Sequence, residues 1–142
     1  MRTSIVCTLA GLVAGCAEAA TNPNTTDFGG NWQYVETLID LPNGISCADT
    51  GVYRLTQMGE KFAGDYVQVG VCHTTMGVLS NADSGGVAGG RVVGHTLRFT
   101  VDQVCEYDGA LDHDTGKITG LVLCVLIGPD TLRLTGNWSA TR

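Results

Sequence analysis

The chain has 142 residues, 44% of them hydrophobic and 15% charged, with 20 glycines and 6 cysteines. This length suits one compact domain, and the apolar content excludes a disordered chain or a coiled coil. Eight Lys and Arg against 14 Asp and Glu give a net charge of −6, so the surface lacks the positive charge that nucleic-acid binding needs.

The N-terminal residues have the pattern of a bacterial export signal. A positive start at residues 1–3 precedes an apolar run over residues 4–14, which is too short to span a bilayer. The run ends in Leu-Val-Ala-Gly-Cys, which resembles the bacterial lipobox with Cys16 as the lipidated residue. The resemblance implies a lipoprotein signal peptide at residues 1–15. It also implies that palmitate and other acyl chains on Cys16 hold the protein in the outer membrane, because Ala17 is not the Asp that favours the inner one.

An ordinary secretory signal is the alternative. Cleavage after the Ala17-Glu18-Ala19 triplet would discard Cys16 and leave a periplasmic or secreted protein. The residues that follow are polar and lack a period. We therefore expect residues 16–27 to form a flexible tether and residues 28–142 to form the folded domain.

The domain has an alternating apolar and polar pattern of period two, which is typical of half-buried antiparallel strands. The predicted strands cover residues 31–39, 51–57, 62–70, 74–79, 88–93, 96–102, 117–127 and 131–139. Turn-forming Gly, Asp and Pro residues separate most of them. The pattern predicts an all-β fold, a closed up-and-down antiparallel barrel of about eight strands, because an open sheet would leave exposed edges.

Several segments interrupt this pattern. Residues 40–50 and the Gly-rich residues 80–90 are expected to be mobile loops at the rims. Residues 121–127 are apolar on both faces, so either a loop covers them or they contact a partner. Residues 108–116 resemble a calcium loop only in part, and their Asp and Gly content is also typical of a hairpin turn, so we predict neither a metal nor a cofactor.

Four cysteines remain in the domain: Cys47, Cys72, Cys105 and Cys124. An even number in an oxidising compartment predicts two disulfides, for which three pairings exist. We favour Cys47 with Cys72 and Cys105 with Cys124, since each pair then joins neighbouring strands. The spacing of a zinc site is missing.

Two Gly-Asn-Trp triplets mark the ends of the domain, beginning at Gly30 and ending at Trp138. The first triplet together with the terminal Arg142 resembles the calycin superfamily, the lipocalin-like and avidin-like barrels. The resemblance implies that Trp32 plugs one end of the barrel and that Arg142, or else Arg133, packs over its indole. The residues after Trp32 differ from the biotin-binding pattern of the avidin-like proteins.

Alternation along the first strand places Tyr34 and Glu36 on the same face as Trp32. Glu36 would then point into the barrel, where a carboxylate is costly unless it is paired or lines a binding site. The interpretation we favour from sequence is that a bulge or the strand end turns Glu36 to solvent. Tyr34, Glu36, Tyr66 and Trp138 are the candidate ligand-binding residues.

The sequence contains no recognisable catalytic motif, so we expect a protein that acts by binding and not as an enzyme. The favoured function is that of an envelope protein whose barrel binds a small apolar ligand or a lipid. The alternative is a protein-interaction module, such as a protease inhibitor or an envelope assembly accessory.

Overall fold

A computed structural model describes residues 26–128 and 131–142. The expected signal peptide, the lipidation site at Cys16 and the tether up to residue 25 lie outside the described residues. Within the described part, no helix is long and apolar enough to cross a membrane.

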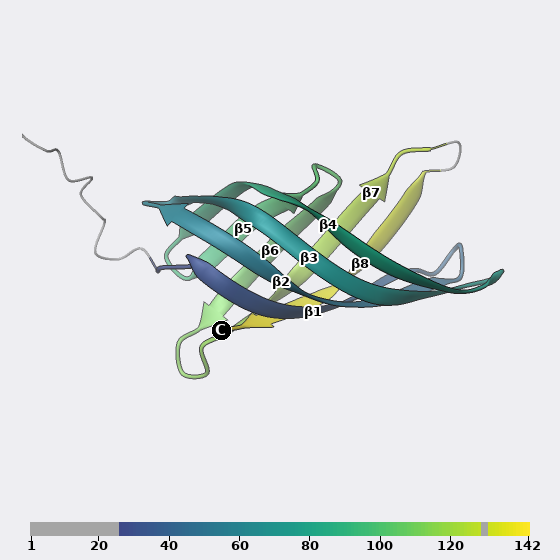
Figure 1. Cartoon of the computed structure of the whole chain (residues 1–142), viewed down its shortest axis with the longest axis horizontal. Helices are drawn as coiled ribbons and strands as arrows, with labels where there is room; N and C mark the ends of the chain where they lie inside the picture. The colour runs from purple at the N-terminus through teal and green to yellow at the C-terminus, as the bar shows by residue number, and fades with distance from the viewer. Residues whose placement is uncertain (1–25, 129–130) are drawn as a thin grey trace, which may run out of the picture.

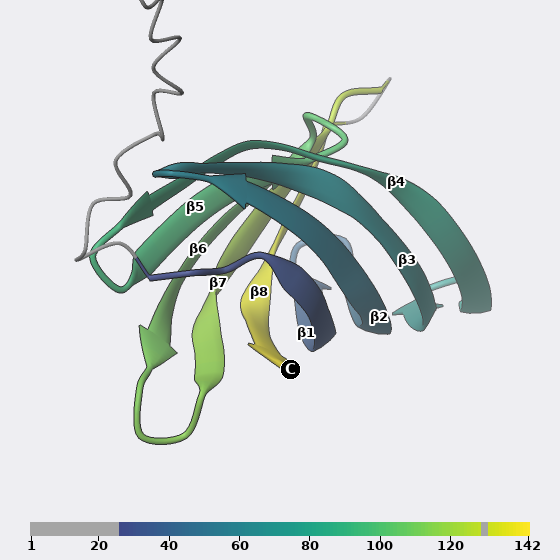
Figure 2. The same ribbon diagram turned by 60° about the vertical axis from the view of Figure 1, so that its left-hand side comes forward.

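Eight antiparallel strands form a closed barrel in which each strand pairs with its neighbours in sequence and β8 pairs with β1 (Figure 1). The strands are β1 (Gly30–Asp40), β2 (Ile45–Met58), β3 (Lys61–Thr74), β4 (Gly77–Val93), β5 (Thr96–Val101), β6 (Cys105–Asp112), β7 (Lys117–Leu126) and β8 (Leu132–Thr141). The turned view shows β8 beside β1 and the strands curving around a shared interior (Figure 2). The predicted all-β, up-and-down barrel is confirmed.

One long strand replaces two predicted ones. The sequence predicts strands at residues 74–79 and 88–93 with a mobile loop at 80–90 between them, and this prediction is wrong. Strand β4 runs without interruption through the Gly-rich segment. Its first part, up to residue 86, pairs with β3 alone, because β5 is short and begins its pairing at Val87.

The glycines of β4 allow close packing and a bulge. Gly90 lies against Phe62, where a Cβ would collide with the ring and the carbonyl oxygen of that residue. Gly89 has a φ of 63°, which favours glycine, at an irregularity in the pairing with β5. The glycines inside β4 therefore allow neighbouring residues to pack closely against its backbone, and they do not form a loop.

Two other elements differ from the sequence-based prediction. Strand β6 was not predicted, because its Asp and Gly residues suggested a turn or a calcium loop. Cys105, Tyr107 and Leu111 nevertheless alternate inward along it. The expected loop at residues 40–50 is also shorter than predicted, since β2 begins at Ile45 and only the four residues between β1 and β2 form the turn.

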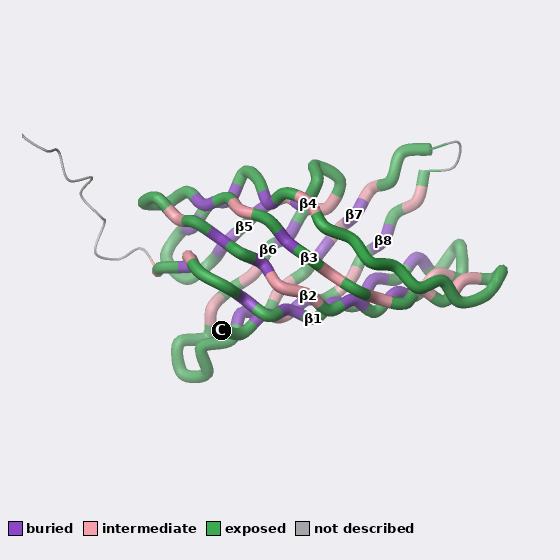
Figure 3. Tube along the Cα trace, viewed as in Figure 1, coloured by how far each residue is buried: buried purple, intermediate pink, exposed green. Residues whose placement is uncertain are grey.

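All of the aromatic side chains lie inside the barrel. The chain has three Phe, four Tyr and two Trp, and the buried core contains Phe28, Trp32, Tyr34, Tyr53, Phe62, Tyr66, Phe99, Tyr107 and Trp138. The buried positions alternate with exposed ones along the strands (Figure 3). Tyr53 lies at the centre of this cluster, stacked on Tyr34 with ring centroids 4.0 Å apart and edge-on to Tyr107 and Trp138. Much of the interior is therefore filled by rings.

The end of the barrel at the start of β1 is sealed by an arginine over a tryptophan. The guanidinium carbon of Arg142 lies 4.5 Å from the centroid of the Trp32 ring. Arg142 also donates hydrogen bonds to the carbonyl oxygens of Asp27 and Gly29, at 2.6 and 2.8 Å. This is the arrangement that the calycin resemblance implies, with Arg142 and not Arg133 as the partner of Trp32.

The segment before β1 completes the seal. Phe28 is fully buried, and its carbonyl oxygen accepts a hydrogen bond from the Trp32 indole at 2.8 Å. Gly30 follows with a φ of 110°, a conformation that glycine adopts readily. The chain thus crosses the end of the barrel before β1 begins.

Both disulfides cross-link neighbouring strands toward the end of the barrel opposite this seal. Cys47 of β2 bonds to Cys72 of β3, and Cys105 of β6 bonds to Cys124 of β7, which is the pairing favoured from the sequence. The two cysteines of each pair are directly opposite in the strand register. Each disulfide therefore fixes the register of one strand pair.

The seal predicts a specific loss of stability for Arg142→Gln. The variant loses the contact with Trp32 and the two hydrogen bonds to carbonyl oxygens, so the free energy of unfolding should fall by about 1 to 2 kcal/mol. Urea unfolding followed by tryptophan fluorescence measures this. The control Arg133→Gln should leave the midpoint unchanged, and an equal effect of both substitutions would contradict the assignment.

Candidate functional site

The interior is apolar near Trp32 and carries carboxylates toward the disulfides. The carboxylates come from Glu36 and Asp40 in β1, Asp49 in β2, Asp83 in β4 and Asp102 after β5, and tyrosines accompany them. Asp40 is 4% exposed and accepts hydrogen bonds from Asn43 in the turn after β1. We call this half of the interior the polar end. Every Lys, Arg and His among residues 26–128 and 131–142 is exposed, so the polar end receives no buried basic side chain from the described chain.

Glu36 points into the barrel and is only 4% exposed. The strand registers of β1 continue without a bulge, so the favoured expectation that Glu36 turns to solvent is wrong and simple alternation holds. One carboxylate oxygen accepts a hydrogen bond from the Tyr107 hydroxyl at 2.8 Å. Burial, together with the charge of Asp49, raises the pKa of Glu36 to about 7, although the Tyr107 hydrogen bond opposes the shift.

Asp49 is directly opposite Glu36 across the β1–β2 pair and is 3% exposed. Its Oδ1 atom has no hydrogen-bond partner in the described chain. The carboxylate lies over Gly70 of β3, where a Cβ would collide with Oδ1. Burial raises the pKa of Asp49, and the Asn81 amide partly offsets this effect. The absent side chain at position 70 therefore makes room for a buried carboxylate.

Tyr53 has a second buried polar atom without a partner. The residue is 2% exposed, and its hydroxyl oxygen makes no hydrogen bond with the described residues. Burial, with the nearby Tyr107 and Glu36, raises its pKa well above the ordinary value. A protonated, unpaired hydroxyl thus lies among the rings beneath the carboxylates.

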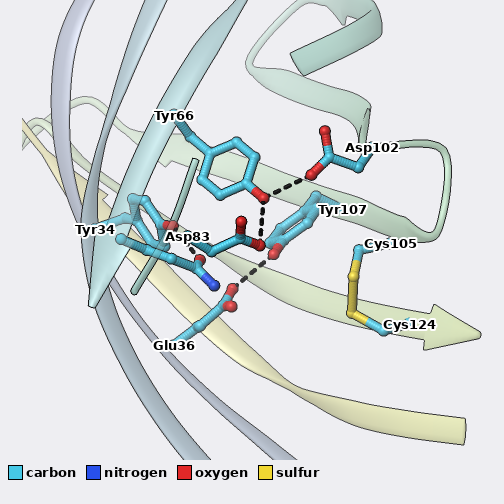
Figure 4. The surroundings of a disulfide bond; sticks show 9 residues. Tyr34, Glu36, Tyr66, Asp83, Asp102, Cys105, Tyr107 and Cys124 are labelled. Carbon is cyan, nitrogen blue, oxygen red and sulfur yellow. Dashed lines mark hydrogen bonds between the residues drawn. A yellow bond between two sulfur atoms is a disulfide. The ribbon is translucent and has the colours of Figure 1, made fainter. Parts of the chain in front are cut away.

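Two carboxylates flank the hydroxyl of Tyr66 where the polar end opens to solvent (Figure 4). Tyr66 Oη lies 2.6 Å from Asp102 Oδ2 and 3.0 Å from Asp83 Oδ2. The backbone amide of Gly86 donates to Asp102 Oδ1 at 2.8 Å, and Asp102 itself has a φ of 47°, which is uncommon for a residue other than glycine. A hydroxyl has one proton, so it cannot donate fully to both carboxylates at once.

The four residues expected from sequence to line a ligand site all face the interior. Tyr34 is buried and donates to Gln68 Oε1 at 2.6 Å, and burial followed by the charge of Glu36 raises its pKa. Trp138 packs edge-on against Tyr107 and donates from its indole to the Asp108 carbonyl oxygen at 3.1 Å. Tyr34, Glu36 and Tyr66 thus contribute polar groups to the polar end, and Trp138 is directly opposite Glu36 in the β1–β8 pair.

Sequence reasoning missed Asp40, Asp49, Asp83 and Asp102 as carboxylates of the interior. Asp40, Asp49 and Asp83 lie in segments that the sequence predicts to be loops, and Asp102 is the last residue of the strand predicted at 96–102. Alternation with the neighbouring Cys47 would have placed Asp49 inside, had β2 been predicted to begin at its true start. Asp102 leaves no such signal, because its direction depends on its unusual backbone conformation.

A hollow is present on the outer wall of the barrel. It has a volume of about 620 Å³ and lies over β8, β1, β2 and β3, with Val35, Val52, Val67 and Val69 among the residues that line it. Leu121 of β7, also on the outer wall, is 65% exposed. The apolar segment at residues 121–127 is therefore not covered by a loop of the described chain.

The residues considered for metal binding have other roles. Asp108 of β6 forms an exposed ion pair with Arg98, and Asp112 accepts hydrogen bonds from the backbone amides of Asp114 and Thr115 in the turn to β7. These contacts identify residues 108–116 as a strand and a turn. Across the described ranges, no three His, Cys, Asp or Glu side chains are arranged to hold one metal ion.

No model of a known protein family matches the chain, and no curated protein sequence matches it. Among solved structures, an S-type phycobiliprotein lyase from Guillardia theta is similar, with a TM-score of 0.49 and 8% sequence identity. The match covers 81% of this chain and 88% of that chain. At this level of similarity, the activity of the lyase says nothing about the ligand of this barrel.

The raised pKa of Glu36 predicts a pH dependence of stability. The folded state holds the proton more tightly than the unfolded chain, so the stabilisation from this group is present at acidic pH. It is lost as the pH rises from about 4.5 to about 7. The full shift corresponds to about 3 kcal/mol.

Urea unfolding between pH 5 and pH 8 measures this dependence. Glu36→Gln should flatten the curve and should be more stable than the natural protein at pH 8, whereas the exposed control Glu106→Gln should keep the natural slope. A natural protein whose stability does not fall over this range would contradict the assignment of Glu36 as a buried carboxyl.

Proposed function

We propose that this is a lipid-anchored protein of the bacterial cell envelope whose barrel binds a small ligand at its polar end, without catalysis. The lipobox-like sequence at Cys16 supports the anchor, and the oxidising envelope is consistent with the two disulfides. The ligand-binding part rests on the interior of the barrel and is argued from its unpartnered polar atoms.

The observation that carries the proposal is a pair of buried atoms that have no hydrogen-bond partner among the described residues, Asp49 Oδ1 and Tyr53 Oη. Folded proteins pair nearly all buried polar groups, and each unpaired one costs about 1 to 3 kcal/mol. Asp49 belongs to the polar end, and the Tyr53 hydroxyl lies near Glu36 and Tyr107. A bound molecule that supplies their partners would recover this cost, which favours a ligand at this position.

The polar end is also built in a way that suits binding. Asp83 and Asp102 are exposed at its opening, whereas Glu36 and Asp49 are buried behind them. The two disulfides fix neighbouring strand pairs in this half of the barrel, so the site is preorganised and little conformational freedom is lost on binding.

The chemistry of the site differs from the apolar ligand or lipid expected from the sequence. A purely apolar molecule would desolvate Glu36 and Asp49 without offering them a partner, which is unfavourable. The apolar half of the interior is filled by aromatic side chains. We therefore propose a ligand with hydrogen-bonding groups in place of an apolar one.

Protein interaction through the outer wall is the second candidate function. Four valines are among the residues that line the outer hollow, and two of them, Val35 and Val69, are 53% and 60% exposed. An exposed apolar surface of this kind is typical of contact sites for other proteins. This candidate corresponds to an inhibitor or an assembly accessory.

Native mass spectrometry of the protein purified from its host tests the ligand proposal. We expect folded ions that carry the added mass of a small molecule, released on collisional activation. The adduct should be lost in Asp49→Asn and kept in the outer-wall control Asp65→Asn. Ions that carry no small molecule but retain a second protein would contradict the proposal and favour the outer-wall candidate.

The anchor predicts incorporation of labelled palmitate into the natural protein but not into Cys16→Ser. Lipid attachment needs the thiol, so the variant should also move from the detergent phase to the aqueous phase in a phase-partition experiment. Cys7→Ser, which changes a cysteine inside the expected signal peptide, is the control. Equal labelling of the natural protein and Cys16→Ser would contradict the lipoprotein assignment.

A further inference from the structure

Resting on the proposed function, we propose that the ligand is a small organic cation whose ammonium group lies between the carboxylates of Glu36 and Asp49. The site is assigned from the charge, burial and hydrogen bonding of these two residues and of the tyrosines around them.

The first argument is the repulsion between two buried carboxylates. Glu36 and Asp49 are cross-strand partners in the β1–β2 register, both face inward, and both are almost fully buried. Like charges directly opposite each other destabilise a sheet, and burial strengthens the effect because the local dielectric is low. No basic side chain of the described chain is buried beside them. A positive charge between the two would turn repulsion into attraction.

The second argument is the hydrogen bonding that the site lacks. Asp49 Oδ1 is an acceptor that receives no donor from residues 26–128 or 131–142, and Tyr53 Oη is a hydroxyl that can accept as well as donate. A primary ammonium group has three donors and no acceptor. It can therefore donate to Asp49 Oδ1 and to the Glu36 carboxylate together. A carboxylate ligand would add a third negative charge at the same position.

The aromatic walls are the third argument. Tyr53 stacks on Tyr34 and meets Tyr107 edge-on with ring centroids 6.2 Å apart, and the Tyr107 hydroxyl bonds to Glu36, so aromatic rings adjoin this carboxylate. Aromatic faces attract ammonium groups and also pack against the hydrocarbon part of an amine. The walls thus suit an organic cation better than a hydrated inorganic one.

The opening of the polar end is negatively charged, like the buried carboxylates behind it. Asp83 and Asp102 compete for the single proton of Tyr66, as Figure 4 shows, and both are exposed. Carboxylates at the mouth of a cleft raise the local concentration of cations and speed their association. A cationic ligand would therefore meet negative charge first at the opening and again at its final position.

A metal ion is the competing occupant. A metal site gathers several oxygen or nitrogen ligands around one point. In the part of the chain that the structure describes, no three suitable side chains are so placed. Two carboxylates that face each other on the neighbouring strands β1 and β2 fit the directional donors of an ammonium group.

Isothermal titration calorimetry on the full chain in detergent tests the inference. The probes are butylammonium and 2-phenylethylammonium, each compared with the neutral alcohol and the carboxylate of similar shape, and calcium chloride is titrated alone. We expect saturable one-to-one binding of at least one amine, with the matched alcohol and carboxylate at least about tenfold weaker.

Variants locate the site. Asp49→Asn and Glu36→Gln should each weaken the amine about tenfold or more, whereas Asp65→Asn, an exposed carboxylate on the outer wall, should change the affinity less than about twofold. Both inner substitutions remove a buried charge and keep the side-chain shape, so near-UV circular dichroism should show an unchanged fold.

Several results would overturn the cation assignment. Binding of the alcohol or the carboxylate as tightly as the amine would do so, as would failure of both amines to bind. Calcium binding that Asp49→Asn abolishes would assign a metal site instead. These outcomes leave the proposed function intact if native mass spectrometry still finds a small molecule that depends on Asp49, so failures of the two proposals are distinguishable.

Discussion

The packing of all aromatic side chains into one interior is the constraint on which the rest of the structure depends. Tyr53 contacts five other rings, among them Tyr34, Phe99 and Trp138. Because these rings come from strands distant in sequence, their contacts hold the sheet in its closed form. They also occupy much of the interior, which confines the polar groups to the half of the barrel beyond them. The location of the candidate site is thus a consequence of the core.

The burial of carboxylates without basic partners in the described chain is not explained by a contribution to the stability of the fold. Carboxylates of Glu36 and Asp49 are buried while all described Lys, Arg and His side chains are exposed, although a more stable barrel would have apolar residues in their place. Proteins violate the rules of core packing mainly at functional positions, where the loss of stability is tolerated. The disulfides and the Arg142 seal stabilise the barrel on both sides of this region. The fold therefore tolerates a site that destabilises it locally.

The alternation of apolar and polar residues predicted the barrel and the inward direction of some of the site residues. The period-two pattern was sufficient for the barrel and for the inward direction of Tyr34, and the calycin resemblance gave the contact of Arg142 with Trp32. Residue composition misled the prediction where Asp and Gly suggested loops, in β4 and β6. The direction of a strand residue can be inferred only when the strand is recognised. The inward direction of Asp83 was missed because the glycines of β4 resemble turn residues, and that of Asp49 was missed because the true turn ends at Gly44 and the expected loop continued to residue 50.

The two tryptophans lie at different levels of the barrel, and this gives the protein an intrinsic optical reporter. Trp32 is enclosed beneath Arg142 and Phe28 at the sealed end. Trp138 instead touches the ring of Tyr107, whose hydroxyl bonds to Glu36. Any change in the charge state of that carboxylate alters the electric field at the second indole and leaves the first almost unaffected. The emission spectrum of the unlabelled molecule therefore contains one signal from the vicinity of the carboxylates and one internal reference.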